Sequence, residues 1–154
     1  MKISIQFILS HLFAYIFVSI PYYQWVLKVH YVGEAPVFAR FLLTEAAGAL
    51  WSKAIGFLFP SLFLQSLLIL VFLFMIWDFF VIQSFWKQFS ILIWIRVVLC
   101  GVVSISPAVG NLEGLVFMIP EVSVQIHSLV FLEILLQGLV HTFSFLIFYR
   151  WSNK

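Results

Sequence analysis

Residues 127–149 read HSLVFLEILLQGLVHTFSFLIFY, and this stretch decides how the chain folds. It is long and apolar enough to cross the roughly 30 Å hydrocarbon core of a bilayer as one α-helix. Glu133, Gln137 and His141 recur at every fourth residue, so a helix places them on one face. Because ionisable groups deep in a membrane rarely face lipid, we expect this face to point into a helix bundle and to mark a functional site.

The composition extends this interpretation to the whole chain. Of its 154 residues, 64% are hydrophobic and 9% are charged, whereas a soluble domain has about 25% charged residues. The 19 Phe, six Trp and five Tyr suit helix packing in lipid and anchoring at its interfaces. A formal charge of +2 without a long basic run gives no support for a nucleic-acid partner. The expected partner is therefore the lipid bilayer.

Four segments reach spanning length and predict an all-α fold, a four-helix transmembrane bundle that forms a single integral membrane domain over residues 1–154. The predicted spans are residues 3–27, 54–77, 89–106 and 127–149. The first apolar stretch is about twice as long as the hydrophobic region of a signal peptide, and no small-residue cleavage site follows it, so we expect a retained helix. The single cysteine, Cys100, excludes a disulfide within the chain.

Residues 28–53 form the most polar stretch, and the sequence leaves two structures open for it. It is either a polar loop or an extension of the first helix to about Arg40. Thr44 is a suitable start for the second helix, because its hydroxyl can accept a hydrogen bond from a free backbone N–H. A helix that starts there is longer than the bilayer core requires, so we expect Pro60 to mark a kink.

Small residues recur at Gly48, Ser52 and Gly56, one helical turn apart. This spacing predicts a face on which a neighbouring helix packs closely. The same face is the expected assembly surface if the chain is a structural subunit of a membrane complex or forms a homo-oligomer.

The distribution of Lys and Arg predicts the topology. We expect the turn into the third span at residues 86–88, and we expect Pro107 and Gly110 to end that span. Four spans place both termini and the second loop on one side, which holds Lys2, Lys87, Arg150 and Lys154, while the other side holds Lys28, Arg40 and Lys53. This bias predicts a multi-pass membrane protein with both termini in the cytoplasm.

Five residues form the predicted interior polar site: Arg96, Glu133, Gln137, His141 and His11. Counted from the ends of their spans, His11, Arg96 and His141 fall at similar depth. Glu133 is about 12 Å further along its helix than His141, too far for the two side chains to share one metal ion. Two interpretations stay open: a structural network that fixes helix register, or a polar path in which Glu133 and His141 meet a proton or cation and Arg96 is the counter-charge.

Histidine placement gives an alternative from another class, a membrane b-type haem protein. Its axial ligands would be the pairs His11 with His141 and His30 with His127, each on facing helices. We predict no other cofactor.

Sequence motifs give no support for catalysis. The chain has no nucleophile elbow, phosphate loop, zinc-hydrolase motif or paired catalytic carboxylates. Our interpretation is a polytopic membrane protein that moves or senses a small cation or solute through its polar interior.

Short apolar motifs resemble those of a known family. The matching positions are Ala35, Pro36, Phe38, Ala47, Gly48, Phe59 and Pro60, followed by His127, Ser128 and Leu129 at the start of the last helix. On these motifs the chain resembles small bacterial integral membrane proteins of unknown function that are related to transmembrane protein 205 and, more distantly, to the membrane domain of copper-resistance protein D.

The resemblance implies a four-helix inner-membrane protein, with a distant relationship to metal-handling and haem-binding proteins. Two features depart from the family pattern. The Asn expected shortly after His127 is absent, with Glu133 in that region, and the chain lacks the Met and His clusters expected of a copper carrier.

Overall fold

The computed structural model describes residues 2–32, 36–40, 42–102, 108–117 and 121–152, and every regular element in these residues is helical. This confirms the all-α prediction. Three of the helices are long and apolar enough to cross a membrane: Lys2–Tyr31, Ala49–Met75 and Val124–Trp151. Large apolar side chains are exposed along all three, whereas His11, Arg96, His141 and other polar groups are buried. This arrangement is the reverse of a soluble domain and indicates a multi-pass membrane protein.

The first helix is continuous but irregular. It consists of α1 (Lys2–Ala14), α2 (Ile20–Tyr22) and α3 (Lys28–Tyr31), joined by π-helical turns at Tyr15–Ser19 and Tyr23–Leu27. Pro21 lies between the two π turns; it lacks a backbone N–H and its ring crowds the preceding turn, which favours such local widening.

The first helix ends at Tyr31, because Val32 has extended backbone angles. The alternative in which it continues to Arg40 is therefore wrong. A short 3₁₀ turn, Phe38–Arg40, follows, and Glu34 and Ala35 lie outside the described residues.

The second helix begins later than predicted. Glu45–Ala47 is a 3₁₀ turn, and Gly48 has a φ of 54°, a conformation that interrupts the helix and favours glycine. The hydroxyl of Thr44 caps no N–H, so that prediction is wrong. The regular helix consists of α4 (Ala49–Gly56) and α5 (Leu58–Met75). Its break at Phe57 fits the predicted kink, because Pro60 cannot donate a hydrogen bond to the preceding turn.

The chain then reverses and returns. After α6 (Trp77–Val81), it turns at residues 82–84 and enters α7 (Phe85–Ile93), which continues as a π-helical segment, Trp94–Val102. The predicted turn at residues 86–88 is wrong, since these residues are helical. Pro107 lies outside the described residues, and α8 (Leu112–Phe117) follows Gly110, whose φ is 92°.

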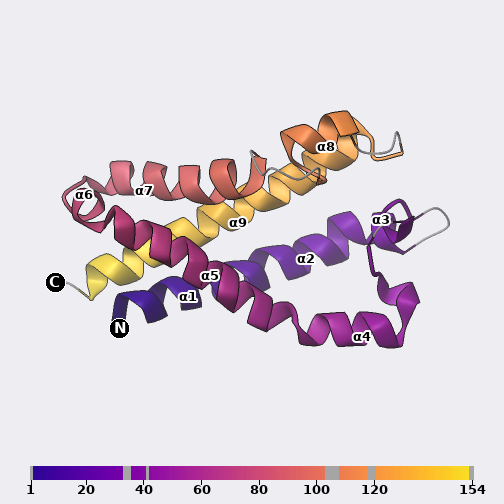
Figure 1. Cartoon of the computed structure of the whole chain (residues 1–154), viewed down its shortest axis with the longest axis horizontal. Helices are drawn as coiled ribbons and strands as arrows, with labels where there is room; N and C mark the ends of the chain where they lie inside the picture. The colour runs from indigo at the N-terminus through magenta and orange to yellow at the C-terminus, as the bar shows by residue number, and fades with distance from the viewer. Residues whose placement is uncertain (1, 33–35, 41, 103–107, 118–120, 153–154) are drawn as a thin grey trace.

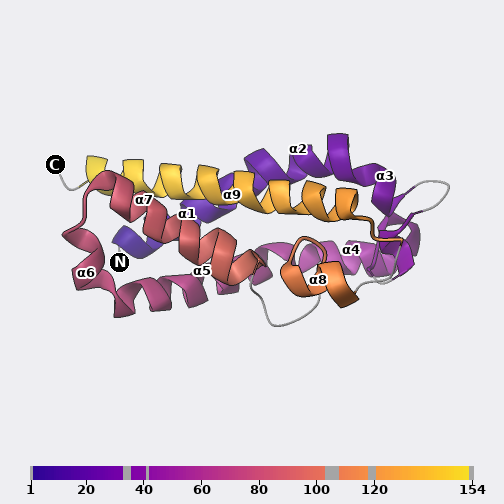
Figure 2. The same ribbon diagram turned by 90° about the horizontal axis from the view of Figure 1, so that it is seen from above.

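The last helix, α9 (Val124–Trp151), is the centre of the fold. The hydroxyl oxygen of Ser123 accepts a hydrogen bond from the N–H of Ile126 and caps its start. Figure 2 shows α9 running beside α7 and close to the first helix, and it also contacts α8 and the π-helical segments of both neighbours. An insertion or loss in α9 would therefore disturb the first helix, α7 and α8.

Both termini lie at the same end of the molecule as α6, as predicted for the second loop (Figure 1). The ammonium of Lys2 donates to the carbonyl of Ser152 at 3.1 Å, which ties the two ends together. An apolar core that includes Phe7, Leu73 and Phe145 fills this end. From there the first helix and α5 diverge toward the opposite end, where α3 and α4 are well separated (Figure 1).

Candidate functional site

A cavity of about 470 Å³ lies where the first helix diverges from α4 and α5. Its lining residues are Tyr15, Ser19, Ile20, Tyr23, Gln24, Leu27, Tyr31, Glu45, Trp51, Ile55, Leu58, Phe59 and Glu133. Ile20, Ile55 and Phe59 are exposed, so apolar surface borders the cavity. Its volume is in the range of small-molecule sites, which hold ligands by apolar walls and a few polar groups.

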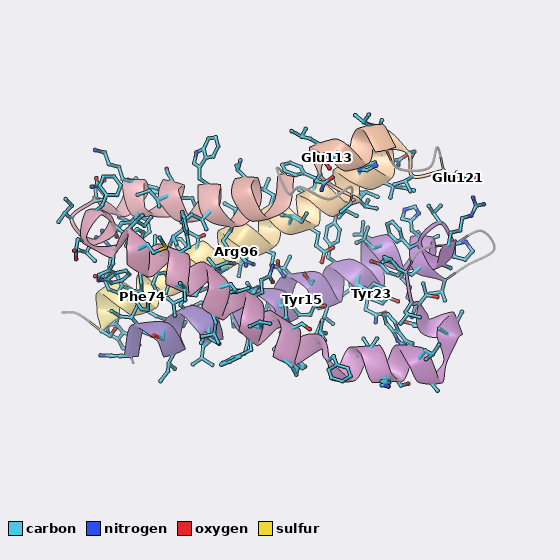
Figure 3. The ribbon with its side chains drawn as sticks, viewed as in Figure 1. Tyr15, Tyr23, Phe74, Arg96, Glu113 and Glu121 are labelled. Carbon is cyan, nitrogen blue, oxygen red and sulfur yellow. The ribbon has the colours of Figure 1, made fainter. Side chains whose placement is uncertain are left out.

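One wall is a row of residues on the first helix, four positions apart: Tyr15, Ser19, Tyr23, Leu27 and Tyr31. A π turn holds more residues than the 3.6 of an α turn. The two π turns therefore bring the average repeat close to four, and the row stays on one side of the helix. Figure 3 shows Tyr15 and Tyr23 between the first helix and α4–α5.

This row is the part of the site that sequence reasoning missed. In a regular α-helix, residues four positions apart rotate around the helix axis over this length. The five residues of the row therefore face one side only because of the π turns. The available signal was the recurrence of Tyr and Ser every fourth residue on both sides of Pro21.

Glu133 closes the cavity from α9. Its carboxylate interacts with the hydroxyl of Ser19 and acts electrostatically on Tyr15 and Tyr31 across the cavity. It makes no ion pair with any residue that the structure describes. A carboxylate in the middle of a membrane-spanning helix therefore borders an open cavity without a counter-charge.

The second carboxylate of the cavity, Glu45, is already compensated. Its Oε1 lies 3.6 Å from Nζ of Lys28 and accepts a hydrogen bond from the hydroxyl of Tyr23 at 2.9 Å. These contacts connect the first helix to the turn before α4 and close the end of the cavity nearest the loops. The two carboxylates thus differ: Glu45 is part of the wall, and Glu133 is available to a ligand.

A chain of polar contacts leads from Glu133 into the bundle. The amide nitrogen of Gln137 donates to the hydroxyl of Ser19 at 3.1 Å, and the guanidinium of Arg96 donates to the amide oxygen of Gln137 at 3.4 Å. In Figure 3, Arg96 lies near the middle of the molecule. The structure therefore brings Arg96, Gln137 and Glu133 into one network, as the sequence predicted.

His11 and His141 form a separate pair next to this network. Their ring centroids are 5.3 Å apart and both side chains are fully buried. The Oγ of Ser66 hydrogen-bonds both the carbonyl of Leu62 and Nδ1 of His11; because the hydroxyl proton goes to the carbonyl, the Nδ1–H of His11 donates to Oγ. Both imidazoles interact electrostatically with Arg96, so the structure brings the three residues close together.

The histidines of the haem alternative have identifiable neighbours in the structure, and haem binding stays a prediction. The rings of His11 and His141 lie next to each other. His30 packs against the ring of Phe38, while Nδ1 of His127 accepts a hydrogen bond from the N–H of Gly110 at 3.0 Å. Within the described ranges, no group of three His, Cys, Asp or Glu side chains is placed to hold a metal ion.

The predicted packing face of Gly48, Ser52 and Gly56 is open within this chain. A Cβ atom added at Gly48 or Gly56 would meet no atom within 4 Å, and Ser52 is exposed. Gly48 also precedes α4 and is not part of the helical face. Among the described residues nothing would meet a side chain at Gly48 or Gly56, and the role of this face in assembly stays a prediction.

Comparisons with family models, with curated proteins and with solved structures find no match to this chain. The candidate site therefore rests on the geometry of the cavity and on the position of Glu133 within it.

Proposed function

We propose that this chain is a four-span inner-membrane protein that binds a small cation or solute in the cavity beside Glu133 and moves or senses it. The observation that carries the proposal is the carboxylate of Glu133, which borders an open cavity within a membrane-spanning helix and makes no ion pair with a described residue. Burial of an uncompensated charge is unfavourable, and a bound cation removes that cost.

The fourth span in this proposal is the helix formed by α7 and the π-helical segment Trp94–Val102. It packs along α9, and its buried charge, Arg96, is hydrogen-bonded to Gln137. A charged residue that is satisfied inside a bundle does not prevent a helix from crossing the membrane. The Lys and Arg bias of the sequence then assigns the end with both termini to the cytoplasm.

The relationship to small bacterial membrane proteins is also a proposal, supported by the sequence motifs given above. It assigns no role to a residue of the cavity. Neither Glu133 nor the row of residues on the first helix belongs to those motifs.

Thermal unfolding of the purified protein in dodecyl maltoside, a detergent without an ammonium group, tests the function. We expect at least one compound from a panel of inorganic and organic cations to raise the unfolding temperature of the wild-type protein, because a ligand that binds only the folded state stabilises it. Glu133→Gln is expected to abolish this shift. Glu121→Gln is the matched control and should keep the cation-dependent shift, since Glu121 is an exposed carboxylate outside the three candidate spans.

Two outcomes would contradict the proposal. In one, no cation changes the unfolding temperature of the wild-type protein. In the other, Glu133→Gln keeps the full cation-dependent shift, which would place binding elsewhere in the chain.

A further inference from the structure

We propose that the ligand of this cavity is an organic cation, a substituted ammonium that carries apolar groups. The inference rests on the proposed function, since it names the class of cation that binds beside Glu133. Three features of the cavity support it: its size, the chemistry of its walls and the number of its carboxylates.

The size of the cavity favours a molecule over a bare ion. A volume of about 470 Å³ is suited to a ligand with many non-hydrogen atoms. A single Na⁺ or Mg²⁺ would occupy a small part of it and would leave the remaining walls without contact. An organic cation can place its charged group at Glu133 and fill the remaining space with its apolar part.

The walls of the cavity are aromatic and aliphatic. Five rings line it, those of Tyr15, Tyr23, Tyr31, Trp51 and Phe59. Aromatic faces attract cations, Trp most strongly, and cages of such rings recognise quaternary ammonium groups. Trp51 comes from α4 and the three tyrosines from the first helix, so the rings stand on both sides of the opening.

The same walls supply few carboxylates for a metal ion. Ca²⁺ and Mg²⁺ take six or more oxygen ligands, mainly from carboxylates, carbonyls and water. This cavity has two carboxylates, and Glu45 is already paired with Lys28. One available carboxylate among aromatic rings is suited to a single diffuse positive charge.

A substituted ammonium can reach this site from two sources. It can be a free solute, or it can be the headgroup of a membrane lipid, because apolar surface borders the cavity at Ile20 and Phe59. Both present the same chemistry to Glu133 and the rings. The experiment therefore needs a medium without any ammonium, to which lipid is added as a separate variable.

Calorimetric titration with benzyltrimethylammonium tests the inference. The full-length protein is kept in dodecyl maltoside, an uncharged detergent without an ammonium group. We expect saturable binding at one site. Glu133→Gln and the uncharged carbon analogue of the probe, neopentylbenzene, should each weaken binding at least about tenfold, because a buried ionic contact is lost.

Removal of one ring provides a second measurement. Trp51→Leu should weaken binding at least about fivefold, because it removes the cation–ring interaction but keeps an apolar side chain. Trp25→Leu is the matched control: Trp25 is 84% exposed and does not line the cavity, so binding should be unchanged. Equal affinities for the two variants and the wild-type protein would overturn the role of the aromatic walls.

The remaining outcomes separate this inference from the proposed function. If phosphatidylethanolamine competes with the probe, the ammonium comes from a lipid headgroup; if it does not compete, the source is a free solute, and both results support the inference. If Na⁺, K⁺ or Mg²⁺ stabilises the wild-type protein through Glu133 while benzyltrimethylammonium does not bind, the inference is wrong and the proposed function stands. If no cation binds, both are wrong.

Discussion

Gln137 keeps two opposite charges apart inside the membrane. Its amide oxygen accepts from Arg96, and its amide nitrogen donates to Ser19, the residue that also meets Glu133. A direct ion pair between Arg96 and Glu133 would neutralise both charges and would leave the cavity without an attractive group. One neutral side chain thus hydrogen-bonds the guanidinium, and the carboxylate faces the cavity.

Gly138 allows α9 and the π-helical segment Trp94–Val102 to approach closely. A Cβ atom at this position would lie 2.6 Å from Cγ2 of Val97, too close for any real contact. We expect Gly138→Ala to force these helices apart and to lower the free energy of unfolding by about 1–3 kcal/mol. Unfolding of the purified protein by increasing denaturant measures this loss.

The matched control for this prediction is Gly56→Ala. An added Cβ at Gly56 meets no atom within 4 Å, so the substitution should leave stability unchanged or slightly higher. A similar loss in both variants would show that the helix contact at Gly138 has no special role.

The ion pair between Arg40 and Glu121 should make stability depend on pH. The pKa of Glu121 lies below its ordinary value, because a backbone N–H and the Arg40 guanidinium both hydrogen-bond the carboxylate. A carboxyl group with a lowered pKa contributes stability that is complete above its unfolded-state pKa, near 4.5, and that is lost as the pH falls through the folded-state value.

Unfolding temperatures of the wild-type protein and Glu121→Gln, compared from about pH 7 down to about pH 3, measure this contribution. The wild-type protein should be the more stable of the two near neutral pH, and the difference should vanish toward the acidic end. A constant difference over the whole range would exclude the ion pair as its cause.

At the scale of the element, the irregular first helix determines the shape of the cavity. In a regular α-helix, a turn of about 100° per residue would place Tyr31 about 160° away from Tyr15. The two π turns remove this rotation and keep both tyrosines on the cavity side. The helix loses regular hydrogen bonds around Pro21, and as a result the residues of the row line one wall of the cavity.

Pro21→Ala should therefore separate stability from binding. A regular helix regains a backbone hydrogen bond, which should raise the free energy of unfolding by about 1–3 kcal/mol. Tyr23 and Tyr31 should turn away from the cavity, and affinity for benzyltrimethylammonium should fall at least about fivefold. Pro36→Ala, which changes a proline in the loop after the helix, is the control for both measurements.

If stability and affinity both rise or both fall in Pro21→Ala, the role given to Pro21 is wrong. Unchanged affinity in Pro21→Ala would show that the π turns persist without the proline or that the row does not contact the ligand. Circular dichroism separates these two results, since it reports whether the helix content has changed.

The sequence was sufficient for the length and the neighbours of the helices but not for their irregularities. Apolar length located the first and last helices to within a few residues, and the depth argument correctly placed His11, Arg96 and His141 together. Pro21 favours the π turns, but their positions and the positive φ of Gly48 also depend on how neighbouring helices pack, which periodicity does not contain. The cavity follows from these irregularities, and so the tyrosine row was not predicted.

At the scale of the whole molecule, the common position of the two termini is a test of topology. In a Cys100→Ser background, Leu43→Cys places a thiol at the end opposite the termini, and Gln83→Cys places one in the turn between α6 and α7. A membrane-impermeant maleimide added to intact spheroplasts should label only the first. The second should react after lysis, and the reverse pattern would invert the proposed orientation.

The central position of α9 has a consequence for biogenesis. Gln137, whose amide oxygen accepts a hydrogen bond from Arg96, is synthesised 41 residues after it. At about 5–20 residues per second, the ribosome needs several seconds to bridge that interval. During that time the guanidinium must rely on the insertion machinery or on lipid headgroups for solvation, and the cavity takes shape only when α9 brings Glu133 to the first helix and α4–α5.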